Sequence, residues 1–438
     1  MTLVKGGHYD YLNFKQLILI NKKNGMNHGL NQAAFHFEPS ALEPIMLSIE
    51  HRAIVKATVP LLETGGEALT THFYQLLLAE HPELRPLFNP AHQADGAQPR
   101  ALANGVLMYA RHIDQLEALG DLVGRIVNKH VALQIQPEHY PLVGACLLRS
   151  IEEVLGKDIA TAEVLAAWGA AYQQLADILI GAEAQLYQRN AQADGGWRGA
   201  RPFRLVRKEV ESAEITSFYL APVDGGAILI AQPGQYIGLR LAIGGQEQRR
   251  NYSLSALASG RQYRISVKRE AGGTVSNYLH DALQLGETLD LFAPAGDFTL
   301  RSSTKPLVLI SGGVGITATL AMLEAALPTG RPVTFIHCAR NAAVHGFRRH
   351  VDALVAAHPQ LQRFYCYGSD DGSGTLADAN GHLNAAKLAD WLPAERDLDA
   401  YFLGPKAFMA SIRRQLLAHG VPAEQCHYEF FGPAAALE

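Results

Sequence analysis

The sequence predicts a multidomain protein, in which an all-α domain is followed by an antiparallel β-barrel domain and then by an α/β domain with a parallel sheet. Residues 46–192 repeat apolar positions at spacings of three and four, which is typical of amphipathic helices. Residues 193–303 contain short runs rich in β-branched and aromatic residues, which indicate a small barrel. Residues 304–438 alternate apolar strands with helical segments, which favours a parallel sheet.

The composition excludes several classes of protein. The chain has 438 residues, of which 48% are hydrophobic, so it is long enough to bury a sizeable core. Its net charge of −4 gives no basic bias toward nucleic acid or anionic lipid. No run of about 18 apolar residues predicts a membrane span. The four cysteines are far apart in the sequence and form no CxxC pair, which argues against a disulfide framework and a zinc site. We therefore expect a cytoplasmic protein with no nucleic-acid partner and no obligate membrane partner.

Residues 1–45 show little periodicity and contain much Asn, His and Gly. The apolar run LILI at 17–20 is too short for a signal peptide, and no small-residue cleavage site follows it. A better helical pattern begins at Met46. We interpret residues 1–45 as a poorly ordered extension, and a wrongly chosen start would produce the same feature.

The helical domain directs one imidazole toward its own core. Val123, Ile126 and Val127 precede His130 by seven, four and three positions, so the four side chains share one helix face. A lone histidine on an apolar face is usually a satisfied core residue. Here Tyr140 and Glu183 are available to hold the ring, as a metal-ligating imidazole requires.

Three other histidines are rival ligands in this domain. His139, His112 and His72 are the alternatives, and His139 ranks well below His130 because we expect it in a loop after Pro137. A second pocket wall is predicted from the segments around HFYQ and ELRPLF. An all-α domain of this length is the right size for a globin, which packs its helices around haem.

Specific segments resemble the globin domain of the bacterial and yeast flavohaemoglobins. They are KATVPLL, HFY, ELRPLFN, QPRALA, NKH, QPEHYPLVG and AWGAAYQQLA, which lie between Met46 and about Asn190. The resemblance implies that His130 is the proximal ligand of haem b, with Tyr140 and Glu183 as a charge-relay pair. It implies further pocket residues, namely Tyr74 and Gln98 as hydrogen-bonding partners of bound O2, Phe88 and Leu102 as packing residues, and Lys129 beside the proximal histidine. A distal hydroxyl stabilises partial negative charge on oxygen.

The barrel domain contains RRNYSLS at 249–255, with an R-x-Y-S pattern at Arg250, Tyr252 and Ser253. An arginine can pair with a pyrophosphate, and a tyrosine ring can lie against a flavin. PGQYIGL upstream, with VKREAGGTVSNYLHD and LFAPAGDF downstream, resembles the FAD domain of the ferredoxin-NADP reductase type. The FAD-binding residues that this resemblance implies are Tyr236, Arg250, Asn251, Tyr252, Ser253, Gly273, Val275 and Ser276.

The last domain contains PLVLISGGVGITATLAMLEAAL at 306–327, a strand, a glycine-rich turn and a helix. Backbone N–H groups there can bind a pyrophosphate. The NAD(P)-binding residues predicted from this segment are Gly313, Val314, Gly315, Ile316, Thr317 and Ala318. The family usually has proline at Ala318, and in the FLGPKAFM motif it has cysteine at Leu403.

The terminal HYEFFGP at 427–433 also matches the family. The resemblance implies that Phe431 stacks on the flavin and is displaced by nicotinamide, and that Glu429, with Lys129, tunes the redox potentials. It places the end of the chain in the FAD site through Phe430, Phe431, Gly432 and Pro433.

The resemblance covers all three domains in order and implies a nitric oxide dioxygenase. NO and O2 become nitrate at the cost of NAD(P)H, and electrons pass from NAD(P)H to FAD to haem, for NO detoxification. We expect a monomer whose partners are the small molecules NO and O2. Two alternatives remain: a globin that senses or stores O2, and a flavin reductase that serves an external acceptor. The preference for NADH or NADPH stays open, since Arg340 could meet a 2′-phosphate. A lipid or an azole could also enter the distal pocket.

Overall fold

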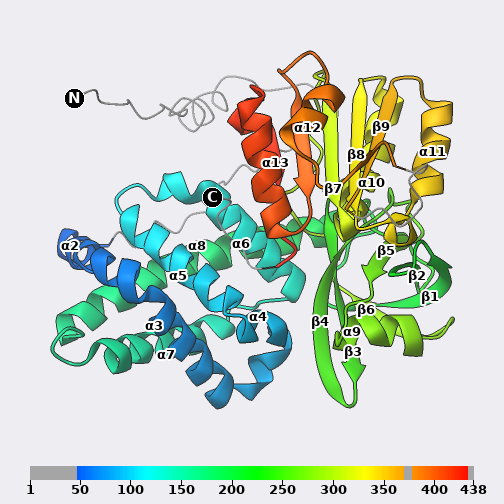
Figure 1. The fold of residues 1–438 in the computed structure, drawn as a ribbon. Helices are drawn as coiled ribbons and strands as arrows, with labels where there is room; N and C mark the ends of the chain where they lie inside the picture. Colours follow the sequence, from blue (N-terminus) through cyan, green and yellow to red (C-terminus); the bar gives the residue numbers. More distant parts are fainter. Residues whose placement is uncertain (1–46, 369–376, 433–438) are drawn as a thin grey trace, which may run out of the picture. The chain divides into compact units, whose positions relative to one another are not determined.

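A computed structural model describes residues 47–368 and 377–432 (Figure 1). The predictions for residues 1–45 and for Pro433 therefore lie outside the described residues. The predicted fold class is confirmed: helices come first, then an antiparallel sheet, then a parallel sheet.

The first part of the described chain is all helical. Its elements are α2 (Ile49–Ala57), α3 (Val59–Glu80), η1 (Pro82–Leu87), α4 (Pro90–Ala94), α5 (Ala97–Arg111), η2 (Leu116–Leu119), α6 (Gly120–Leu133), α7 (His139–Leu155) and α8 (Ala162–Gln192). Ser48 caps α2 and Thr161 caps α8, each accepting a hydrogen bond from a first-turn N–H. Gln134 ends α6 in the left-handed conformation, with φ 63°. Gln134 therefore ends α6 shortly after His130, whereas Glu183 lies within the long helix α8.

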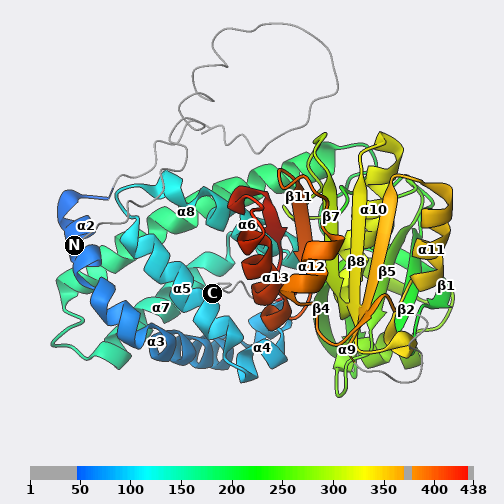
Figure 2. The same ribbon diagram turned by 45° about the horizontal axis from the view of Figure 1, so that its top comes forward.

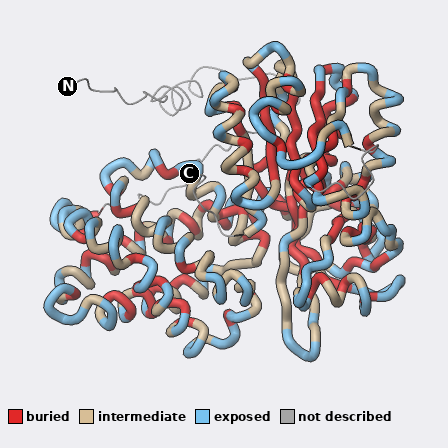
Figure 3. The backbone as a smooth tube through the Cα atoms, in the orientation of Figure 1, coloured by how far each residue is buried: buried red, intermediate tan, exposed pale blue. Residues whose placement is uncertain are grey.

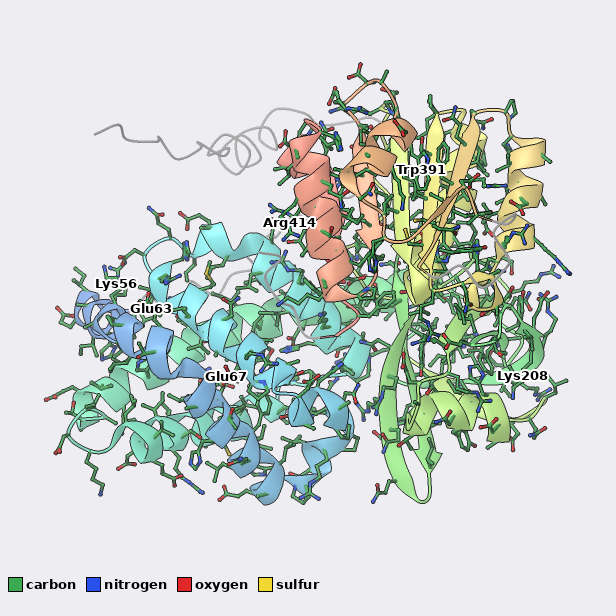
Figure 4. The ribbon with its side chains drawn as sticks, in the orientation of Figure 1. Lys56, Glu63, Glu67, Lys208, Trp391 and Arg414 are labelled. Atoms are coloured by element: carbon green, nitrogen blue, oxygen red, sulfur yellow. The ribbon has the colours of Figure 1, made fainter. Side chains whose placement is uncertain are left out.

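Helices α3 and α5 pack side by side, and surface ion pairs join them. Glu63 lies 2.5 Å from Arg111, and Glu67 lies 3.1 Å from Arg100 (Figure 4). Because these pairs are exposed, each contributes little to stability. The apolar core beneath them does more, since Leu69, Phe73 and Leu77 are buried there.

The second part is a six-stranded antiparallel sheet in the order β4-β3-β6-β1-β2-β5. The strands are β1 (Arg201–Val210), β2 (Ile215–Pro222), β3 (Tyr236–Ile243), β4 (Gln246–Ser253), β5 (Tyr263–Lys268) and β6 (Thr288–Leu291). A bridge between Leu254 and Ile265 links the two edges, which closes the sheet into a barrel. Two short helical segments, α9 (Thr274–Asn277) and η3 (Tyr278–Ala282), lie between β5 and β6 in the chain.

Strand β4 is not among the runs that predict strands, because it is almost entirely polar. It forms because Gly244 and Gly245 both have positive φ, at 57° and 78°, which suits a tight two-residue hairpin. The hairpin pairs β4 along the whole of β3. Tertiary pairing therefore overrides the weak local signal.

The third part is a six-stranded parallel sheet in the order β10-β9-β8-β7-β11-β12. Its strands are β7 (Leu307–Gly312), β8 (Val333–Ala339), β9 (Leu361–Tyr367), β10 (Ala379–Asn380), β11 (Asp399–Leu403) and β12 (Cys426–Tyr428). Its helices are α10 (Ile316–Ala326), α11 (Arg348–Ala357), α12 (Ala385–Trp391) and α13 (Lys406–Ala418). In Figure 2, α13 and α11 lie on opposite sides of the sheet.

Both faces of the parallel sheet are buried, as Figure 3 shows by the red strands at its centre. One face packs with α10 and the other with α12 and α13. Such two-sided burial explains why these strands are continuous apolar runs in the sequence. None of the helices within residues 47–368 and 377–432 combines the length and apolar character needed to cross a bilayer.

Candidate functional site

His130 lies near the end of α6, within a buried polar network. Its Nδ1 is 2.7 Å from Oε1 of Glu183 on α8 and 3.2 Å from the hydroxyl of Tyr140 on α7. Tyr140 donates a 2.6 Å hydrogen bond to the same Glu183 oxygen. Burial, and then the Glu183 charge, raise the pKa of Tyr140, so its hydroxyl remains a donor. Because Nδ1 faces Glu183, Nε2 is the nitrogen left to act as a ligand.

The rival histidines are engaged elsewhere. His72 forms a surface pair with Glu153 at 2.6 Å, and His112 bonds the carbonyl of Met108 at the end of α5. The expectation that His139 lies in a loop is wrong, because it is the first residue of α7. Its Nδ1 accepts a hydrogen bond from the backbone of Gln136, which stabilises the start of that helix.

The predicted distal residues come together on α3, α5 and the segment between them. Gln98 Nε2 donates to the hydroxyl of Tyr74 at 3.3 Å, and the rings of Phe88 and Tyr74 pack edge to face at 5.5 Å. Leu102 lies one turn after Gln98, against the same core. Burial raises the pKa of Tyr74 to about 12. The hydroxyl is therefore neutral at physiological pH and can donate a hydrogen bond.

The R-x-Y-S residues lie on β4, opposite Tyr236 on β3. The register pairs Tyr236 with Ser253 and Gly238 with Asn251. Arg250 is half-buried, and its guanidinium donates to the Arg249 carbonyl and to Gln248. It makes no ion pair with a carboxylate in the described ranges. A half-buried cation of this kind fits a phosphate group.

The predicted phosphate loop begins α9. Val275 and Ser276 are buried, and Ser276 Oγ accepts a hydrogen bond from the backbone N–H of Glu270 at 3.2 Å. A Cβ on Gly273 would lie 2.5 Å from that same Oγ. Glycine is therefore needed at position 273 for the loop to keep this close approach.

The last described residues return to the helical domain. Lys129 donates a hydrogen bond from Nζ to the Gly432 carbonyl. Burial raises the pKa of the Glu429 carboxyl, whereas the Lys129 charge opposes this shift. Oε2 of Glu429 is buried and has no hydrogen-bond partner among the residues that the structure describes. Phe430 packs edge to face on Tyr428, whereas Phe431 is 48% exposed.

The glycine-rich turn lies between β7 and α10. Gly313 has φ +55°, and Thr317 Oγ1 donates to the carbonyl of Val314 at 3.0 Å. A Cβ on Gly315 would lie 2.5 Å from the carbonyl oxygen of Leu403, the last residue of β11. The sheet reverses its strand order between β7 and β11, and ligands of open parallel sheets bind at such switch points.

The structure also places Ala318 and Leu403, the two positions that depart from the family pattern, and Arg340. Ala318 is the third residue of α10 and is fully buried, and the Leu403 side chain is buried in the sheet core. Arg340 forms an ion pair with Glu214, which precedes β2. That partner explains an arginine at this position without requiring a 2′-phosphate.

Contacts between the helical part and the barrel were not found by sequence reasoning. The Asn128 carboxamide oxygen accepts a hydrogen bond from the Gly296 N–H at 2.8 Å, and Arg249 donates to the Leu133 carbonyl at 2.6 Å. Asn128 is 2% exposed. In the sequence, Asn128 is marked only as a polar residue directly before Lys129 and His130. That position has no distinctive spacing that would predict a contact with the barrel.

Family models match each part of the chain. They are Globin over residues 71–179, Oxidoreductase FAD-binding domain over 202–300 and Oxidoreductase NAD-binding domain over 309–414. The predicted cofactors, haem, FAD and a nicotinamide nucleotide, are confirmed at this level. The matches and the site define an oxidoreductase that joins a globin to a FAD- and NAD-binding reductase.

The chain is 73% identical over 393 residues to a flavohemoprotein of Pseudomonas putida. The aligned region spans 90% of this chain and all of that relative. The chain belongs to the flavohaemoglobin family. The solved flavohemoglobin of Malassezia yamatoensis, with bound FAD and heme, is 27% identical, has a TM-score of 0.78, and covers 88% of this chain and all of its own. The FAD/NAD-binding domain of nitric oxide dioxygenase from Vibrio cholerae is 40% identical, has a TM-score of 0.50, and covers 54% of this chain and all of its own.

Proposed function

We propose that this flavohaemoglobin is a nitric oxide dioxygenase, which converts NO and O2 to nitrate with electrons from NAD(P)H and so detoxifies NO. One NO, one O2 and one electron combine to give one nitrate ion. A nicotinamide supplies two electrons, so two nitrate ions form for each NAD(P)H consumed. The nitric oxide dioxygenase domain of Vibrio cholerae, which is similar to the reductase part, supports this proposal.

The residues present fit the three groups that the family implies. His130 directs Nδ1 to Glu183 and keeps Nε2 for iron. Arg250 is a half-buried cation suited to a pyrophosphate, and Gly315 gives the close backbone approach that a nucleotide turn requires. When bound, haem supplies the iron that activates O2, and FAD converts two-electron nicotinamide chemistry to single electrons.

The observation that carries the proposal is the combination of a proximal carboxylate with a distal hydroxyl. Glu183 accepts from both His130 and Tyr140, so it holds the imidazole in one tautomer and makes Nε2 more basic. Tyr74, positioned by Gln98, presents a neutral hydroxyl that stabilises partial negative charge on oxygen. A strongly donating ligand with a polar distal group favours O2 activation over simple storage.

The remaining residues have proposed supporting roles. The Lys129 charge lies close enough to Glu429 to oppose the rise in its pKa, and that raised pKa lets the Glu429 carboxyl hold a proton near neutral pH. Tyr236, Asn251, Tyr252 and Ser253 are proposed to contact the flavin. We propose that the chain acts as a monomer on NO and O2.

The decisive experiment is aerobic, NADH-driven NO consumption by the purified protein loaded with haem and FAD, with nitrate quantified. We expect one nitrate per NO and two per NADH, and loss of activity in His130→Ala. Slow NO turnover with tight O2 binding would instead support the O2 sensor. Rapid oxidation of an added acceptor without haem reduction would support the external reductase.

A further inference from the structure

Two of the four cysteines lie side by side in the parallel sheet. Cys338 on β8 and Cys366 on β9 are direct partners in the strand register. Residues paired in this way point to the same face of a sheet. Neighbouring strands are about 4.7–4.9 Å apart, and a disulfide requires a Cα separation of about 4.4–6.8 Å. The two cysteines are far apart in the sequence, but the strand register brings them close enough for a disulfide.

The two thiols interact directly. Their interaction lowers the pKa of the Cys366 thiol and raises that of the Cys338 thiol. Cys366 Sγ also contacts the carbonyl of Gly381 at 3.1 Å. Of the two thiols, Cys366 is therefore the one that more readily loses its proton.

A lysine is fixed beside this pair. Lys387 Nζ donates to the carbonyls of Asn380 at 2.5 Å and His382 at 2.9 Å, on either side of Gly381. It forms no ion pair with a carboxylate in residues 47–368 and 377–432. Its charge adds to the lowering of the Cys366 pKa and opposes the rise in the Cys338 pKa, so it favours the Cys366 thiolate.

The other two cysteines lack this environment. Burial raises the pKa of the Cys426 thiol to about 11, and it also raises the pKa of Cys146. Cys146, Cys426 and Cys366 are buried, whereas Cys338 is partly exposed and gives the pair its contact with solvent. The chain therefore contains one thiol of lowered pKa, Cys366, beside a partner thiol, whereas Cys146 and Cys426 serve as internal controls.

We propose that Cys338 and Cys366 form a redox-active dithiol, which hydrogen peroxide oxidises to an intramolecular disulfide. The Cys366 thiolate attacks one peroxide oxygen and the O–O bond breaks. A sulfenic acid on Cys366 and, after protonation of the leaving hydroxide, one water form. The second thiol attacks that sulfur, the S–O bond breaks, and the S–S bond forms with loss of a second water. Two electrons pass from the thiols to the peroxide.

The location connects this dithiol to the nucleotide turn. Cys338 is the register partner of Gly312 on β7, and Gly312 leads directly into the glycine-rich turn. Helix α12 covers the same region, since Trp391 stacks on Phe364 of β9 at 5.0 Å (Figure 4). The disulfide would therefore lie one strand from the proposed pyrophosphate site.

The test uses full-length holoprotein in which Cys146→Ser and Cys426→Ser leave only the pair. After hydrogen peroxide, alkylation and intact mass should show loss of both thiols and of two hydrogen atoms, reversed by dithiothreitol. Proteolysis should yield a peptide that joins Cys338 to Cys366. If the double variant does not fold, the same peptide is sought in the unmodified chain.

Single variants complete the test. In the Cys146→Ser, Cys426→Ser background, Cys338→Ser should stop at a sulfenic acid on Cys366, which dimedone traps. The proposal is overturned if both thiols still alkylate after peroxide. It is equally overturned if each is oxidised separately to a sulfinic acid, or if the disulfide joins two chains.

Discussion

At the scale of single residues, the Glu183 carboxylate governs the chemistry of His130. Glu183 is 2% exposed, and a charge at such a site is costly unless donors surround it. Tyr140 and His130 supply those donors at 2.6 and 2.7 Å. Satisfying the carboxylate therefore orients the ring and strengthens it as a ligand at the same time.

The proposed iron ligand can be tested by substitution. His130→Ala should abolish haem retention, because the rival histidines His72, His112 and His139 are engaged elsewhere. Haem content per chain, measured by its absorbance, is the readout. His112→Ala and His139→Ala are matched controls that should keep full haem content. Unchanged haem in His130→Ala would refute the assignment.

The distal hydroxyl should slow O2 release. Tyr74→Phe removes a donor worth about 1 kcal/mol, so the O2 dissociation rate should rise roughly five- to tenfold. Stopped-flow displacement of O2 from the reduced protein measures it. Tyr109→Phe is the control, since its hydroxyl bonds Ala171 and Gln174 instead. An unaltered rate in Tyr74→Phe would exclude the distal hydrogen bond.

At the scale of elements, the turn between β7 and α10 depends on how closely β11 approaches it. Gly315 touches the end of β11, where any side chain would meet backbone. Ala318 occupies the first turn of α10, where a proline would preset the helix. Packing between two elements thus controls the loop that receives the nucleotide.

This packing predicts a specific loss in the reductase. Gly315→Ala should slow NADH-driven flavin reduction by roughly tenfold or more, since a misplacement of about 1 Å can cost about 100-fold. Anaerobic stopped-flow of the flavin absorbance measures the rate. Gly105→Ala on α5 is the control, because nothing lies within 4 Å of its new Cβ. Equal rates in both variants would contradict the role of the turn.

The parallel sheet also predicts how stability changes with pH. Burial lowers the pKa of His337, on β8, to about 3, and its Nδ1 contacts Ser311 at 2.8 Å. In the unfolded chain His337 binds a proton as the pH falls through about 6.5, whereas in the folded chain it stays neutral until a much lower pH. Stability should therefore fall as pH falls below about 6.5, by about 1 kcal/mol at pH 5.5.

Thermal unfolding of the protein at pH 7.5 and 5.5 measures this effect. His337→Asn retains a polar group toward Ser311 but cannot titrate, so it should reduce the acid-induced drop in melting temperature. The exposed His382→Asn should leave the drop unchanged. An identical drop in His337→Asn would rule out this linkage.

At the scale of the whole molecule, the helical part and the barrel meet through backbone. A Cβ on Gly238 of β3 would lie 2.2 Å from the carbonyl of Ala132 on α6. Asn128 and Arg249 add hydrogen bonds across the same contact. Because α6 also carries His130, this contact sets the position of the proposed iron ligand relative to the flavin domain.

Gly238→Ala should therefore uncouple the two halves. We expect slower haem reduction by NADH with an unchanged rate of flavin reduction, since the new methyl group forces α6 away from β3. Stopped-flow spectra separate the two steps, and Gly181→Ala on α8 is the control. Normal haem reduction would show that this approach does not govern electron passage.

Sequence alone predicts the order of the three folds, which is confirmed, and proposes most residues of the candidate site. Helical and strand periods report which face of an element is buried, so they identified the helical range, the barrel and the parallel sheet. Short motifs such as R-x-Y-S and the glycine-rich turn carry their contacts within a few neighbouring residues, so local sequence was enough to locate them.

Tertiary structure decided what depends on register and on contacts between distant segments. The polar strand β4 exists because β3 pairs with it, and Cys338 meets Cys366 because two strands align. Asn128 meets Gly296 only after the helical part and the barrel pack together. Local periodicity encodes the faces of elements, whereas the partners of each face are chosen when the chain folds and long-range packing selects one arrangement.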